Sequence, residues 1–345
     1  MKKILAQEAF YLFGMGRRPK LIWRNHRLLE LETGRTLACF DERIPAAILP
    51  DRYQVQVGED AVWEDESGLY LRQDGQTRVF SRASVSLPDF EPSPHAALMR
   101  VLHHDLLVSV VKGKPLPNPL VYRTPWYRDS AMMAMALQRT GNLGEMREWI
   151  LSLEEPYDRN NQGVEESDNL GQALYLISLV SDRNHPLVEK LLQEAERRTE
   201  NGHLTGLSDY DLHPVYQTKW LKYGLSHLGM DHSRWTVPAI DDSYAELFWM
   251  DDTVPEPQAE PVSYEEERYP YLNVAKAHKR RAPLENLPDG KHYPVSWEKE
   301  ASEAEYGREL PYLHHYAREK MGAPHTWHAA ELLLYLMDEA GKGER

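Results

Sequence analysis

Charged and aromatic residues gather at the start of an apolar helix predicted near residue 130. Trp126 and Tyr127 directly precede the pair Arg128-Asp129. A run of small and flexible apolar residues follows, which predicts a helix buried on nearly every side. Aromatic rings bind the apolar face of a sugar, and a fixed guanidinium and carboxylate bind its hydroxyl groups. The stretch therefore indicates a carbohydrate pocket. The alternative is structural, with Asp129 capping the helix and Arg128 as its ion-pair partner.

A second stretch places several carboxylates just ahead of another predicted helix. They are Asp158, Glu165, Glu166 and Asp168. Neighbouring carboxylates near a helix start can have their pKa values pushed apart, so that one stays protonated as an acid. The alternative is that Asp168 caps the helix and its neighbours are solvated. A calcium loop starting at Asp158 is disfavoured, because its twelfth position is Asn169 and not Glu.

Other polar and aromatic residues at predicted helix starts are candidates for substrate binding or for anchoring loops. They are Tyr216, Gln217, Lys219, Trp220, Trp297, His325 and Trp327. Glu298 follows Trp297 after an extended run, so it is a better site candidate than Glu300 or Glu303, which are typical of a solvated helix face. No histidine pair has zinc-ligand spacing with a third ligand, and there is no Gly-rich phosphate loop. We therefore expect no metal and no organic cofactor.

Composition narrows the class of partner. The formal net charge is −14, which disfavours nucleic acid and anionic membrane surfaces. Cys39 is the single cysteine, so no intrachain disulfide forms, and this suits a reducing compartment. No apolar run is long enough to span a bilayer. We expect a soluble cytoplasmic protein, and the oligomeric state is not indicated.

The chain changes character near residue 90. Before it, short alternating runs and turn signals such as Asp74-Gly75 predict a small antiparallel β module over residues 1–90. A Pro-rich stretch, 87–94, precedes residues with helical spacing over 91–345. The first helical stretches are 95–112, the helix that starts at Arg128-Asp129, and about 143–153. The others are 168–180, 186–198, 215–228, 238–250, 271–279, roughly 301–321 and 327–340. Polar residues lie mainly in the loops, which predicts a stack of αα-hairpins with its site at one end.

Two motifs resemble those of the six-hairpin glycosidases, most of all the glucoamylase-type glycoside hydrolases. Trp126-Tyr127-Arg128-Asp129-Ser130 is similar to the turn that holds sugar hydroxyls in this class. Pro324-His325-Thr326-Trp327-His328-Ala329-Ala330-Glu331-Leu332 is similar to its last-helix segment. The resemblance implies a mainly α fold, an (α/α)6 toroid after the β module. Fewer helices are predicted than six hairpins require, so either some hairpins are reduced to loops or part of the ring is missing.

The resemblance also implies an activity. We expect an inverting glycoside hydrolase that cleaves a small oligosaccharide, with Glu166 as general acid and Glu165 as its rival. Glu298 is the expected general base, and Glu305 competes with it. Two alternatives remain open. One is a carbohydrate-binding or regulatory protein without a working acid/base pair. The other is an unsaturated-glycoside hydrolase or lyase acting on uronate oligosaccharides.

Overall fold

The computed structural model describes residues 10–120, 122, 124–159, 163–209, 211–239, 287 and 325–342. These residues fall into two compact units. The first comprises the described parts of Met1–Thr124, Met135–Glu145 and Asn286–Arg345. The second comprises those of Pro125–Ala134 and Met146–Glu285. The predicted division at residue 90 follows the change from strands to helices, since β9 ends at Ser81 and α1 begins at Ala96.

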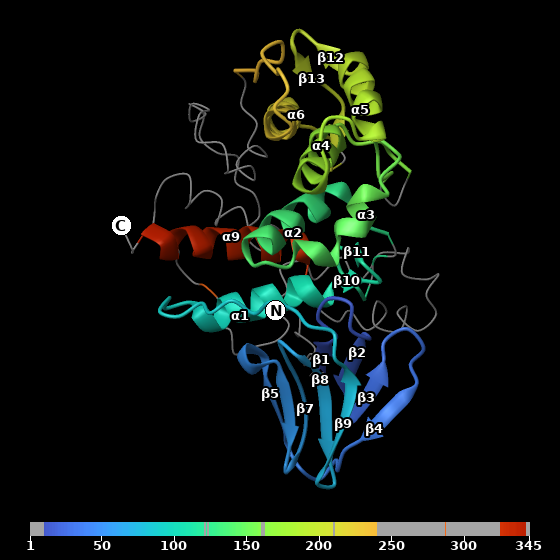
Figure 1. The fold of residues 1–345 in the computed structure, drawn as a ribbon, viewed down its shortest axis with the longest axis vertical. Helices are drawn as coiled ribbons and strands as arrows, with labels where there is room; N and C mark the ends of the chain where they lie inside the picture. Colours follow the sequence, from blue (N-terminus) through green and yellow to red (C-terminus); the bar gives the residue numbers. More distant parts are fainter. Residues whose placement is uncertain are drawn as a thin grey trace, which may run out of the picture. The chain divides into compact units, whose positions relative to one another are not determined.

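The first unit is built on two antiparallel sheets that share one hydrophobic core (Figure 1). One sheet contains β1 (Phe10–Phe13), β2 (Leu21–Arg24), β3 (Arg27–Glu30) and β4 (Thr36–Cys39). The other contains β5 (Ala46–Leu49), β6 (Gln54–Val57), β7 (Asp60–Asp65), β8 (Gly68–Gln73) and β9 (Gln76–Ser81). Alternate residues such as Tyr11, Trp23, Val55 and Leu69 fill the space between the sheets. The predicted hairpin at Asp74-Gly75 is confirmed, because β8 pairs with β9 around it.

Helices and short strands complete the first unit. Helix α1 (Ala96–Val108) packs against the 3-10 turn η1 (Pro50–Arg52) and against α9 (Thr326–Lys342). The hairpin β10 (Val110–Val111) and β11 (Lys114–Pro115) follows α1. A fully buried ion pair joins Arg18 and Glu64 at 3.1 Å. Glu64 also accepts hydrogen bonds from the backbone N–H groups of Gly14 and Met15, so it fixes the β1–β2 loop.

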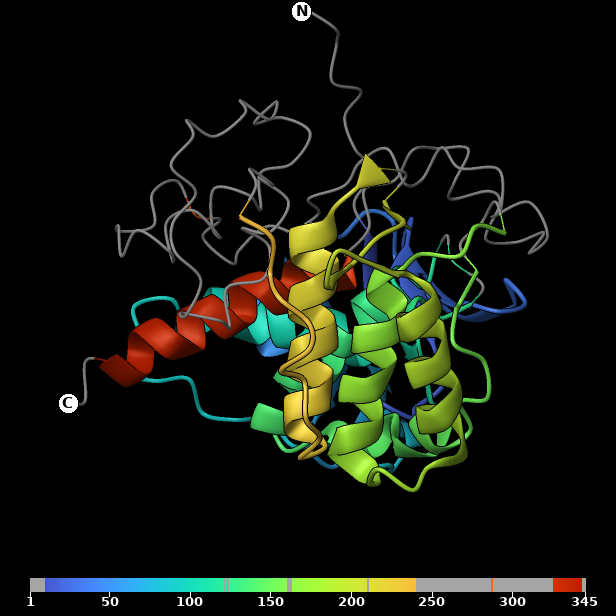
Figure 2. The ribbon, with the colours of Figure 1, turned by 90° about the horizontal axis from the view of Figure 1, so that it is seen from above.

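The second unit is mainly helical. Helix α2 (Tyr127–Arg139) begins in it, and α3 (Arg147–Leu151), α4 (Asp168–Val180), α5 (Pro186–Arg197) and α6 (Pro214–His227) follow. Figure 2 shows α4, α5 and α6, coloured green to yellow, running alongside one another. Two short hairpins join these helices, one of β12 (Thr199–Glu200) and β13 (His203–Leu204), the other of β14 (Leu207–Ser208) and β15 (Asp211–Leu212).

Helices α4 and α6 approach each other at glycines. A Cβ added at Gly171 would lie 2.2 Å from the carbonyl carbon of Trp220 and 2.3 Å from the nitrogen of Leu221. A Cβ at Gly224 would lie 2.5 Å from the carbonyl oxygen of Gly171. Because only glycine lets two helix backbones come this close, these two positions set the separation of α4 and α6.

The predicted mainly α toroid is wrong. Within the described ranges, the chain forms seven α-helices and five antiparallel sheets, a mixed fold. Each predicted helical stretch up to residue 228, and the last one, contains a helix, although Val110–Val111 of the stretch 95–112 forms β10 and only Arg147–Leu151 of the stretch 143–153 is α-helical. The larger error lies in how the helices pack. Helical spacing shows which face of a helix is apolar but not what covers it, and α1 and α9 belong to the unit that contains the large sheets. The helices predicted at 271–279 and 301–321, and nearly all of 238–250, lie outside the described residues.

The part of the chain that the structure describes contains no helix with the length and apolar character needed to cross a bilayer.

Replacing Gly171 by alanine should destabilise the second unit. The added methyl group would overlap the α6 backbone, and overpacking of this kind lowers the free energy of unfolding by about 1–3 kcal/mol or more. Urea unfolding followed by circular dichroism measures the change. Gly341→Ala is the matched control, because Gly341 lies in α9 with nothing within 4 Å of its added Cβ. Equal stability of the two variants would contradict the close approach of α4 and α6.

Candidate functional site

The side chain of Arg128 lies at the centre of a buried group of carboxylates in the second unit. Its Nε is 3.0 Å from Oδ2 of Asp168, and its Nη2 forms a short ion pair with Oε2 of Glu166. All three side chains are almost fully buried. Asp209 is also close, with Oδ1 at 3.9 Å from Nη1 of Arg128. We refer to Arg128, Asp158, Glu166, Asp168 and Asp209 as the Arg128 cluster.

Hydrogen bonds hold the two buried carboxylates in place. Asp168 accepts from the hydroxyl of Ser208 at 2.6 Å and from the side-chain amide of Gln172 at 2.8 Å. Glu166 Oε1 accepts from the backbone N–H of Asp209 at 3.1 Å. Each oxygen of both carboxylates therefore has a partner, as a buried carboxylate requires. The cluster thereby joins the starts of α2 and α4 to the β14–β15 hairpin.

Part of the cluster reaches solvent. Asp158 is half-buried, and the side chain of Asp209 keeps 29% of its exposure. Glu165 lies beside them in sequence but turns to other partners, with its carboxylate 2.7 Å from Arg198 and 3.5 Å from Arg159. The cluster therefore has a buried floor, formed by Arg128 with Glu166 and Asp168, and an exposed rim.

Asp158 differs from the other carboxylates in its protonation. Burial of the carboxyl group raises its pKa from an ordinary value of 3.8 to about 8. The N–H of Tyr127, which donates to Asp158 at 2.5 Å, opposes this shift. The negative charges of Glu166 and Asp168 raise the pKa further, and the charge of Arg128 lowers it. At neutral pH, Asp158 is therefore a carboxylic acid beside carboxylates that are ion-paired to Arg128.

Aromatic residues of the second unit divide into rim and core. Trp126 is partly exposed, directly ahead of α2, where a ring can contact a ligand. Tyr127 is buried, and its hydroxyl donates to the carbonyl of Glu155 at 2.8 Å. Trp220 and Tyr216 are each 1% exposed, with ring centroids 6.4 Å apart, so both lie in the packed interior. The predicted role of Trp220 and Tyr216 in substrate binding stays a prediction.

The remaining predicted residues have different outcomes. Gln217 is buried and donates to the Ser208 hydroxyl at 3.0 Å, so it helps to fix the serine that donates to Asp168. Asp129 and Lys219 are also buried. Trp297, Glu298 and Glu305 lie outside the described residues. His325 and Trp327, both 5% exposed, belong to the first unit.

The sequence assigned no role to Ser208 or Asp209, and it placed Asp158 among four neighbouring carboxylates without selecting it as the acid. Nothing in the local spacing marks these residues, because their importance comes from the fold that places them around Arg128. Among the described residues, no group of three or more His, Cys, Asp or Glu side chains is arranged to hold a metal ion.

Comparison with known proteins finds no family model, no curated protein and no solved structure that matches this chain. The assignment to the six-hairpin glycosidases is therefore wrong, since no match supports it and the described residues combine sheets with only seven helices. The motifs that suggested it, 126–130 and 324–332, are short, and a similar turn does not fix a fold. Function must be argued from the cluster itself.

Asp158→Asn should change how stability depends on pH. The native protein holds one more proton than the unfolded chain between about pH 4 and pH 8, so ionisation of Asp158 makes stability fall as pH rises through this window. Asparagine cannot titrate, and its amide oxygen can still accept from the Tyr127 N–H. The stability difference between variant and wild type should therefore grow in favour of the variant from pH 5 to pH 8.

Urea unfolding of both proteins from pH 5 to pH 8 measures this stability difference. The titration of groups that both proteins share cancels when the two are subtracted. Parallel stability curves would show that the extra proton is not on Asp158.

Proposed function

We propose that the second unit hydrolyses glycosidic bonds, with the carboxyl group of Asp158 as the proton donor. The supporting observation is the split between a protonated Asp158 and the ion-paired Glu166 and Asp168 within one cluster. Carboxyl groups whose environments separate their pKa values are the usual acid and base of glycoside hydrolysis. Partly exposed Trp126 provides an aromatic surface for the sugar.

In this proposal the proton of Asp158 passes to the glycosidic oxygen as the bond to the anomeric carbon breaks. A pKa of about 8 keeps the acid loaded at neutral pH. Glu166 is unsuited to this role, because the guanidinium of Arg128 and the N–H of Asp209 both favour its ionised form. A second carboxylate would activate water. Asp209 is the candidate from the described chain, because its carboxylate reaches solvent. Glu298, which the sequence predicts for this role, lies outside the described residues.

Neutral sugars suit the cluster better than uronates. The single positive charge of Arg128 already faces the carboxylates of Glu166 and Asp168, so the cluster has no surplus positive charge for an acidic substrate. Lys219, another cation of the second unit, is 4% exposed. We therefore do not favour the uronate alternative.

A second candidate function is carbohydrate binding without cleavage. Glu166 and Asp168 are 3% and 0% exposed, and every oxygen of both is engaged inside the protein. Such carboxylates can serve to hold Arg128 and the loops in place. On this interpretation the cluster orders a sugar-binding rim, and Asp158 donates a hydrogen bond to a bound hydroxyl group.

Asp158→Asn tests the proton donor. With neutral oligosaccharides, loss of a general acid should lower kcat by about 10²–10⁴-fold. An aryl glycoside with a strongly acidic phenol should lose much less, because its leaving group departs without protonation. Reducing-sugar release and phenolate absorbance measure the two rates. Asp182→Asn, on the exposed turn before α5, is the matched control and should leave kcat unchanged.

Equal loss on both substrates would contradict proton donation by Asp158, and full retention of activity would exclude the residue from the reaction. Calorimetry with the same oligosaccharides tests the second candidate function, carbohydrate binding without cleavage. A sugar that binds to the wild type but is never cleaved would replace hydrolysis by binding as the function.

A further inference from the structure

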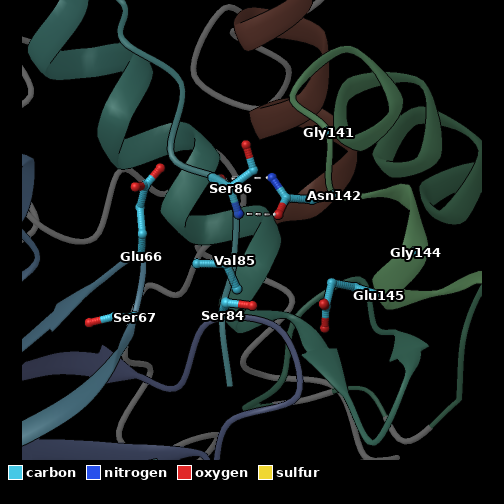
Figure 3. Close-up of a pocket in the computed structure, with 9 residues that line it drawn as sticks. All are labelled: Glu66, Ser67, Ser84, Val85, Ser86, Gly141, Asn142, Gly144 and Glu145. Carbon is cyan, nitrogen blue, oxygen red and sulfur yellow. Dashed lines mark hydrogen bonds between the residues drawn. The ribbon is translucent and has the colours of Figure 1, made fainter. Parts of the chain in front are cut away.

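The first unit contains a pocket of its own. Its volume is about 580 Å³, within the range of about 300–1,000 Å³ that small-molecule sites occupy. Figure 3 shows its walls, which come from the β7–β8 turn at Glu66 and Ser67, the segment 84–86, and the turn 141–145 that follows α2. This pocket contains none of the residues of the Arg128 cluster.

Specific hydrogen bonds hold the walls together. The side-chain amide of Asn142 accepts from the backbone N–H of Ser86 at 2.9 Å and donates to its carbonyl at 2.9 Å (Figure 3). The N–H of Val85 donates to the carbonyl of Glu66 at 3.0 Å. The segment 84–86 is therefore fixed on both sides, and the amide of Asn142 is already engaged.

The groups left for a ligand are mainly acceptors. Glu66 uses Oε1 to accept from the N–H of Leu87 at 3.1 Å, which leaves Oε2. The side chain of Glu145 keeps 17% of its exposure, and its Oε2 accepts no hydrogen bond from the described residues. Nε of Arg17 forms an ion pair with this oxygen at 3.9 Å, which is beyond hydrogen-bond length. Among the described residues that line the pocket there is no lysine, arginine or histidine. It therefore favours a ligand with positive charge and several N–H donors.

The separation of the two carboxylates selects an organic cation over a metal ion. Figure 3 shows Glu66 and Glu145 on opposite sides of the segment 84–86. Within the described ranges, no group of three or more His, Cys, Asp or Glu side chains is arranged to hold a metal ion. We propose that the pocket binds an aliphatic diamine or polyamine, with one ammonium group on Glu66 and another on Glu145. The hydroxyls of Ser84 and Ser86 accept the remaining N–H bonds.

Isothermal titration calorimetry of the full chain with spermidine, in about 150 mM salt to screen diffuse attraction, tests this. Glu66→Gln and Glu145→Gln should each raise the Kd by about tenfold, the effect of one charge-assisted hydrogen bond near the surface. Glu59→Gln removes the same charge from the exposed β6–β7 turn and should leave the Kd unchanged. Butylamine, with one ammonium group, should bind more weakly than spermidine.

Three results would overturn the proposal. They are no binding of spermidine to the wild type, an equal rise in Kd for all three variants, and an unchanged Kd for both pocket variants. Circular dichroism verifies that each variant folds. If Glu145→Gln does not fold, Glu66→Gln decides the outcome, because Glu66 is exposed and its amide can still accept from Leu87.

Discussion

The charge balance around Arg128 determines the properties of the second unit. One buried guanidinium faces two buried carboxylates, so the floor of the cluster already carries a surplus negative charge. A third ionised carboxyl group at Asp158 would add repulsion where little water is present to screen it. Retention of a proton on Asp158 avoids this repulsion. Burial of the carboxyl group is the main cause of the raised pKa of Asp158, and the negative charges of Glu166 and Asp168 add to it.

That balance depends on backbone contacts of residues that carry no charge themselves. Asp168 starts α4, and Ser208, which binds it, lies in the hairpin just before α6. The contact at Gly171 and Gly224 fixes the distance between these helices. A larger separation would break the hydrogen bonds to Asp168 and leave buried acceptors without donors, which is costly. Close helix packing therefore maintains the electrostatics of the site.

Sequence patterns predicted the elements better than the contacts between them. Helical spacing gave correct positions for α1, α4, α5 and α6, because amphipathic periodicity is local. The sequence also suggested Arg128 with its neighbour Asp129 as a pair, but adjacent positions on a helix do not face each other. The structure places Arg128 on Glu166 and Asp168 instead, residues about 40 positions away. No spacing rule connects side chains across that distance.

The predicted toroid was wrong for the same reason, because local sequence patterns do not show how helices pack. An apolar helix face can be buried by another helix or by a sheet-based unit, and its sequence is similar in both cases. The pair Arg128-Asp129 still signals a polar site at a helix start, whatever the fold around it. The idea that one of several nearby carboxyl groups keeps its proton also needs no family, since it follows from burial and like charge. The sequence could not identify that group, because Asp158 becomes buried only when the chain folds.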